Sequence, residues 1–221
     1  MRVLCAVLVW MSALATHGQG TIRYVNLGGI WFPGEAAGSV TSEFGRDTPV
    51  DFDGNGTTDL LFRNPTSFSQ FVLPTGNNAV IARLNPLPDL SSYVVPLALG
   101  HPITPSLSGS LSWVPSRPAV IPSLGPLGSS LSVCVDFGCL GLFVGQTAYM
   151  GVQFDIDGQT HYGWMHLRAN GGFSEVYGFA YNTVPGQPIL AGQVPEPGTI
   201  ALLLVGGSLI WWRHKLAGRS A

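Results

Sequence analysis

Lysine is absent between residues 16 and 195, and charge of either sign is scarce there. That stretch holds six arginines against eleven acidic residues, so it is mildly acidic. Without a basic stripe to hold phosphates, the composition argues against nucleic acid as a partner. Low charge, together with 29 glycines and 17 prolines in the 221-residue chain, is typical of a β-rich exported protein rather than a helical one.

The body also lacks any sustained 3.6-residue apolar period and any repeat of solenoid or propeller length. Short apolar runs between Gly, Pro, Asn and Asp predict an all-β sandwich or jelly-roll. Asp157-Gly158 predicts a tight hairpin turn. Prolines and serines at about 85–128 predict long loops or a seam, so residues 16–193 form one domain or two. Strands are expected at 21–26, 59–63, 68–73, 79–84, 111–114, 131–135, 148–155, 160–168 and 175–182.

Motifs for catalysis are missing as well. The chain has no Gly-x-Ser-x-Gly, no His-Glu-x-x-His and no glycine loop that leads from a strand into a helix. A carboxylate pair for glycoside hydrolysis would have to come from residues that nothing in the sequence brings together: Glu35, Glu43, Asp136 and Glu175. We therefore expect no catalytic residue, and the chain is predicted not to be an enzyme.

Cysteine is nearly absent. Cys5 lies in the N-terminal apolar segment, which leaves Cys134 and Cys139 in the body. In an oxidising compartment these two are expected to form a disulfide, with two free buried thiols as the alternative. A loop this short would contribute about 2 kcal/mol. No other Cys or His cluster accompanies them, which argues against zinc.

Residues 1–15 have the features of a signal peptide. A basic residue at position 2 precedes an apolar run, and Ala13-Leu14-Ala15 is a small-x-small cleavage site. We expect a signal helix cleaved after Ala15, with Gly18 and Gly20 as other positions. An uncleaved N-terminal anchor is the alternative, although the run is short for a membrane span.

The last 28 residues fall into three parts. A proline-rich motif at 194–198 precedes an apolar run at 199–212 and a basic tail at 213–221. The apolar run would make a helix of roughly 21 Å, short for a bilayer core of about 30 Å. Trp211 and Trp212 suit an aromatic belt, and the basic tail is expected to stay cytoplasmic. A single transmembrane helix is therefore predicted, with a buried apolar helix as the alternative.

The motif Val194-Pro195-Glu196-Pro197, the apolar run and the Arg/Lys tail together resemble the PEP-CTERM sorting domain of bacterial exported proteins. The resemblance implies recognition of this motif by an exosortase-type membrane protease. It also implies a body outside the cytoplasm, first anchored in the inner membrane and then at the cell surface or extracellular. Residues 151–192 are similar to a module that often precedes such tails, for which no function follows.

A candidate calcium loop lies at 51–59. Side-chain oxygens recur at positions 1, 3, 5 and 9, and the Thr57 carbonyl would be the ligand at position 7. Position 12 is Phe62 instead of Glu, so the loop resembles the calcium loops of FG-GAP repeats rather than a complete EF-hand. A solvated turn is the alternative. The predicted ligands are Asp51, Asp53, Asn55, Thr57 and Asp59.

The segment 161–168 contains the residues for a second hypothesis. His166 lies five positions after His161, an odd offset, so on a strand the two point to opposite faces and cannot share a metal without a bulge. Tyr162 and Trp164 share a face and are candidates for stacking against sugars. Asp155 and Asp157 fit a hairpin turn better than a second metal site.

Together these features predict a non-enzymatic exported surface or extracellular-matrix protein, associated with exopolysaccharide. Two alternatives remain open. One is a secreted carbohydrate-binding module, and the other is a secreted hydrolase. Calcium is the only cofactor that the residues suggest.

Overall fold

A computed structural model describes residues 22–32, 47–66, 69–84, 92–116, 128–135, 138–170 and 173–195. These ranges are all-β, as the sequence predicted, and they contain no helix that could cross a membrane. The signal segment 1–15 and the apolar run 199–212 with its basic tail lie outside them. Glu196 and Pro197 also lie outside, as do the side chains of residues 132–140.

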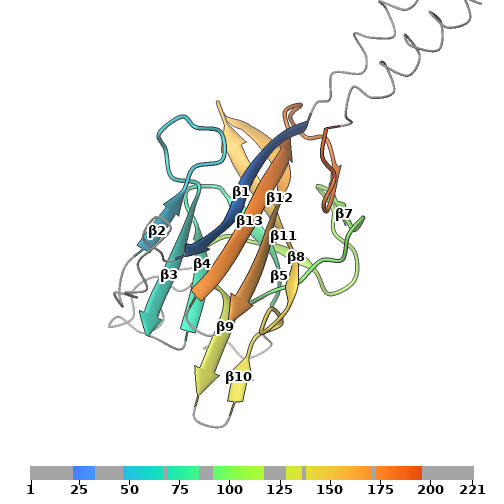
Figure 1. Cartoon of the computed structure of the whole chain (residues 1–221). Helices are drawn as coiled ribbons and strands as arrows, with labels where there is room; N and C mark the ends of the chain where they lie inside the picture. Colours follow the sequence, from blue (N-terminus) through green and yellow to red (C-terminus); the bar gives the residue numbers. More distant parts are fainter. Residues whose placement is uncertain are drawn as a thin grey trace, which may run out of the picture. The chain divides into compact units, whose positions relative to one another are not determined.

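The strands follow the short apolar runs of the sequence, and Figure 1 labels most of them. Their bounds are β1 (Ile22–Phe32), β2 (Asp47–Val50), β3 (Leu60–Thr66), β4 (Ser69–Pro74), β5 (Ala79–Arg83), β6 (Tyr93–Val94), β7 (Pro102–Ile103), β8 (Ser112–Val114), β9 (Ser129–Val135), β10 (Gly138–Leu140), β11 (Thr147–Ile156), β12 (Gln159–Asn170), β13 (Phe173–Asn182) and β14 (Ile189–Leu190). The short strands β2, β6, β7, β10 and β14 were not predicted from the sequence.

One curled sheet holds twelve of these strands, in the order β1-β13-β12-β11-β5-β6-β9-β4-β3-β2, with β8 on β5 and β10 on β9. Its ladders are antiparallel except for the pair β6–β9. The remaining strands, β7 and β14, form a separate two-stranded sheet. Residues 22–193 make one compact unit, and the stretch predicted as loops or a seam contributes β6, β7 and β8 to it.

The main core lies where the two halves of the curled sheet pack against each other. Phe62 and Val72 from β3 and β4 belong to the same buried cluster as Met165, Leu167 and Val176 from β12 and β13. Between the halves, the buried Ser174 hydroxyl donates a hydrogen bond to Gln70. The curl thus lets a single sheet bury one of its own faces.

The opposite face of β12 is buried too. Tyr162 and Trp164 belong to a second cluster with Ile103, Ile189 and Ala191. Segments 95–113 and 189–193 supply most of that cluster, so they cover this face of the sheet. The period of two along β12 is therefore as predicted, but both faces of the strand are interior.

The turn between β11 and β12 is the hairpin that Asp157-Gly158 predicted. Both residues have positive φ, 53° and 77°, as a type I′ turn requires. The Gly158 N–H donates to the Asp155 carboxylate at 2.6 Å. That carboxylate therefore serves the turn.

Candidate calcium-binding loop

The loop 51–59 connects β2 to β3. The two strands pair in register up to Val50 and Leu60, and the Asp59 N–H donates to the Val50 carbonyl at 2.8 Å. Phe52 is 2% exposed, and its ring lies 4.8 Å from that of Phe154 and 5.0 Å from that of Phe179. One aromatic side chain thus anchors a polar loop in the main core.

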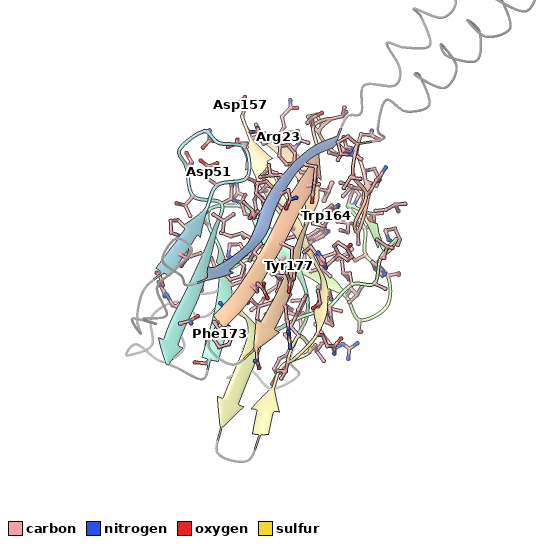
Figure 2. All side chains as sticks on the ribbon, viewed as in Figure 1. Arg23, Asp51, Asp157, Trp164, Phe173 and Tyr177 are labelled. Carbon is pink, nitrogen blue, oxygen red and sulfur yellow. The ribbon has the colours of Figure 1, made fainter. Side chains whose placement is uncertain are left out.

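Three carboxylates of this loop converge. Asp51, Asp53 and Asp59 each offer an oxygen, and these oxygens lie within 4.8 Å of one another. Figure 2 shows Asp51 on the loop at one end of the body. Three like charges at such separations repel one another unless a cation or a proton neutralises them. Within the described ranges this is the single group of three or more acidic, His or Cys side chains that could hold a metal.

Asp51 is held by backbone N–H groups of the loop itself. Gly54 donates to one of its oxygens at 2.7 Å and Gly56 to the other at 2.8 Å. Both glycines have positive φ, 81° and 87°, which favours Gly there. Burial raises the pKa of Asp51, but hydrogen bonds within the loop, led by those from Gly56 and Gly54, together outweigh it, so the pKa lies below its ordinary value.

Asp59 has the opposite environment. It is 3% exposed and accepts a hydrogen bond from the Phe52 N–H at 2.8 Å. Its pKa is raised to about 6, mainly by burial and further by the charges of Asp53 and Asp51, against the lowering effect of that hydrogen bond. A divalent cation among the three carboxylates would favour the ionised form of Asp59, because its positive charge offsets the burial and the repulsion that raise this pKa.

The other two predicted ligands, Asn55 and Thr57, are linked to each other, and Asn55 is linked to Asp53, by hydrogen bonds. The Asn55 side-chain oxygen accepts from the Thr57 N–H at 2.6 Å, and its amide donates to Asp53 at 2.8 Å. Thr57 is exposed. Asn55 therefore shapes the turn in this conformation, and the ligand roles of Asn55 and of the Thr57 carbonyl stay predictions.

Two residues that the sequence did not predict, Asn78 and Thr75, support Asp59 through hydrogen bonds. The amide of Asn78, which is buried, donates to the Asp59 carboxylate and to its carbonyl, both at 3.1 Å. Its side-chain oxygen accepts from the Asp155 N–H at 2.9 Å. Thr75 donates to the Asp59 carbonyl at 3.0 Å. Asn78 thus connects the loop to the β11–β12 hairpin.

Arg23 contacts the loop from β1. Its guanidinium donates to the Asp53 carbonyl at 2.9 Å and to the Tyr181 hydroxyl at 3.2 Å. Figure 2 shows Arg23, Asp51 and Asp157 at the same end of the body. No local signal in the sequence marks Arg23 or Asn78, because their partners lie far away in the chain.

The proposed sugar platform of Tyr162 and Trp164 is wrong as stated, because both rings are buried. Tyr162 is covered by Trp113, whose ring lies 5.5 Å away. Trp164 is 3% exposed, packs edge-on against Tyr149 at 5.2 Å and donates to the Gln193 carbonyl at 3.0 Å. Sequence alternation placed both on the right face, but the segments that cover this face could not be read from it.

The two histidines lie on opposite faces of β12, as predicted. His161 is buried beside Phe154, with its Nδ1 2.8 Å from the Asn182 carbonyl oxygen. His166 stacks on Tyr149 at 4.6 Å on the other face, and burial lowers its pKa. The arrangement gives them no shared ligand.

Cys134 and Cys139 face each other across the β9–β10 hairpin as paired positions. Directly opposed residues of an antiparallel pair have α-carbons about 4.5–5.5 Å apart, within the range that disulfides span. The disulfide remains a prediction, because the two side chains lie outside the described part.

Of the four carboxylates considered for hydrolysis, Glu175 accepts a hydrogen bond from Tyr177 at 2.9 Å, and the other three lie outside the described ranges.

Comparison with known proteins finds no matching family model, no similar curated protein and no similar solved structure.

Proposed function

We propose that this chain is a non-enzymatic, exported surface or matrix protein. Its β-rich body would be held outside the cytoplasm by a C-terminal membrane segment and then sorted by an exosortase-type protease at Val194-Pro195-Glu196-Pro197. The observation that carries the proposal is the three-part order of the last 28 residues. The all-β body, poor in charge, is consistent with export.

The end of the body supports this assignment. Trp164 and the β7–β14 pair hold the chain as far as Gln193. The next residue, Val194, is 42% exposed. A protease needs an accessible extended strap, and Pro195 and Pro197 favour extended backbone. The motif would thus begin where the packed body ends.

For the loop 51–59 we propose a structural calcium ion. The donors fit, since calcium takes six to eight oxygen ligands and three carboxylates already converge here. Asp51, Asp53 and Asp59 would hold it, and the ion would offset their mutual repulsion. Calcium sites of extracellular modules bind at about 10⁻⁴–10⁻³ M, which suits a protein that works outside the cell.

The other candidates have less support. Carbohydrate binding depended on Tyr162 and Trp164, which are interior. No described observation favours a hydrolase. Association with extracellular polysaccharide stays part of the proposal through the resemblance of the tail. The two packed halves of the curled sheet support a sandwich-like architecture for the body.

The sorting proposal is tested by replacing Pro195, Glu196 and Pro197 with alanine in the native host. We expect the full-length form to accumulate in membranes, because the protease no longer recognises its substrate. Pro185→Ala, in an exposed loop of the body, is the matched control and should be processed normally. Unchanged release of the triple variant would contradict the proposal.

A further inference from the structure

Two segments of the body carry no formal charge. Residues 92–116 and 183–195 contain no Asp, Glu, Lys or Arg. These segments meet in space, because β7 pairs with β14 and the Gly100 N–H donates to the Ala191 carbonyl at 2.8 Å. We call the surface that these two segments present the uncharged face.

Large apolar side chains project from the uncharged face where the segments meet. Leu99 is 73% exposed, the highest value among the exposed large hydrophobic residues, and Leu190 is 45% exposed. Val194 follows at the point where the chain leaves the body. Leu99 lies beside Gly192, where an added Cβ would stand 2.3 Å from the leucine methyl carbon. Leu99 and the exit of the chain are therefore neighbours.

The exit itself is tightly fixed. The Ala191 N–H donates to the His101 carbonyl at 2.9 Å, and the Leu190 N–H donates to the Gln193 side chain at 3.0 Å. Gly192 has φ of +78° and is confined between Leu99 and the Tyr149 hydroxyl. Together with the hydrogen bond from Trp164 to the Gln193 carbonyl, these contacts fix the chain as far as the residue before the sorting motif.

The length of chain beyond this point limits the distance to a membrane. Five residues separate Gln193 from the apolar run that begins at Thr199. Even fully extended, six residue steps span roughly 20 Å. The headgroup layer on one side of a bilayer takes up about 5–8 Å of that length. If the apolar run is inserted, the exit of the body is held close to the membrane surface.

We propose that the uncharged face lies against the lipid headgroup region through the exposed Leu99, Leu190 and Val194 while the tail is anchored. This inference rests on the proposed function. Burying charged groups at such a boundary is costly, and this face has none to bury. Exposed leucines gain by entering the boundary between headgroups and acyl chains. The contact would orient the body and hold the sorting motif at the depth of a membrane protease.

Site-specific photocrosslinking of the full-length chain tests this contact. Benzoylphenylalanine would replace Leu99, and the protein would be inserted into vesicles of phosphatidylcholine and phosphatidylglycerol. The matched control places the same group at Phe173, which is also exposed and lies at the start of β13, away from the chain exit (Figure 2). We expect a mass shift of one lipid molecule from position 99 and no such shift from position 173.

Alkaline extraction of the vesicle-bound protein distinguishes a failure of the proposed lipid contact from a failure of the proposed anchor. Extraction-resistant protein without a lipid adduct at position 99 would overturn the inference and leave the anchor in place. An adduct with a second copy of the chain would overturn it in favour of self-association. Protein that alkali removes from the vesicles would overturn both the inference and the proposed anchor.

Discussion

The loop 51–59 and the uncharged face are two regions of one small body with opposite chemistry. The loop concentrates three carboxylates and is held by polar bonds to Asn78 and Arg23. The two segments that form the uncharged face, 25 residues at 92–116 and 13 at 183–195, contain no Asp, Glu, Lys or Arg among their 38 residues. The low charge of the composition is thus unevenly distributed. The loop concentrates carboxylates in one region, whereas two whole segments are left without formal charge.

The largest effect is expected from Phe52, which anchors the loop 51–59 in the main core. Phe52→Ala should cost about 3–5 kcal/mol of unfolding free energy, because it empties a buried aromatic site between Phe154 and Phe179. Urea unfolding of a fragment of residues 16–193 measures this loss. A cost below about 1 kcal/mol would mean that the loop is not anchored through this ring.

The next effect concerns pH in the absence of calcium. The folded pKa of Asp59 is about 6, above its unfolded value, so the folded state binds the proton more tightly. Protonated Asp59 therefore stabilises the folded state at low pH, and this stabilisation is lost as pH rises from about 4 to above 6. It amounts to roughly 1.4 kcal/mol of unfolding free energy for each unit by which the folded pKa exceeds the unfolded one.

The measurement is calcium-free unfolding at pH 4.5 and pH 7.5 for the parent and for Asp59→Asn. The parent should lose more stability than the variant over this interval, because the amide does not titrate. Equal losses in the two proteins would show that Asp59 does not carry the effect.

Removing the link between loop and hairpin comes third. Asn78→Leu deletes hydrogen bonds to Asp59 and leaves the Asp155 N–H without its acceptor. We expect a loss of about 1–3 kcal/mol together with weaker calcium binding, measured by urea unfolding and calorimetry. Asn77→Leu, at the exposed neighbouring position, is the control. Similar losses in both variants would contradict a specific role for Asn78.

Calcium binding should raise the unfolding free energy by an amount comparable to the loss expected for Asn78→Leu. For a site of about 10⁻⁴–10⁻³ M, roughly 10 mM calcium stabilises the fold by about 1.4–2.7 kcal/mol. The increase in Tm should disappear with EDTA and in Asp51→Asn. Asp47→Asn, which removes a carboxylate paired with Arg63 outside the loop, should retain it. An equal response in the two variants would rule out binding at the loop.

The smallest effect is expected on the uncharged face. Leu99→Asp should change the unfolding free energy by less than about 0.5 kcal/mol, because the side chain is largely exposed and buries little. Thermal unfolding of the same fragment checks this. A large destabilisation would mean that Leu99 belongs to the packing of the body, which would weaken its assignment to a lipid contact.

The sequence predicted the local features well. Apolar alternation identified the long strands, Asp157-Gly158 identified the hairpin, and the spacing of Asp51, Asp53 and Asp59 identified the carboxylates that converge. Each of these signals is contained within a few neighbouring residues. The support from Asn78 and Arg23 could not be predicted, because it depends on contacts between distant parts of the chain.

The error at Tyr162 and Trp164 has the same origin. Alternation along a strand shows which side chains share a face, but it does not show whether another segment covers that face. Here residues 95–113 and 189–193 cover it, although their short strands β7 and β14 carry almost no pattern. The curl of the sheet into one continuous structure likewise depends on pairings between distant strands.

Intact mass of the native protein, isolated separately from membranes and from the medium, tests the sorting claim most directly. We expect a released form that begins near Thr16 and ends near Pro195-Glu196-Pro197, alongside a longer membrane-bound precursor. An uncut chain found in membranes alone would contradict it, and the C-terminal segment would then be a permanent anchor.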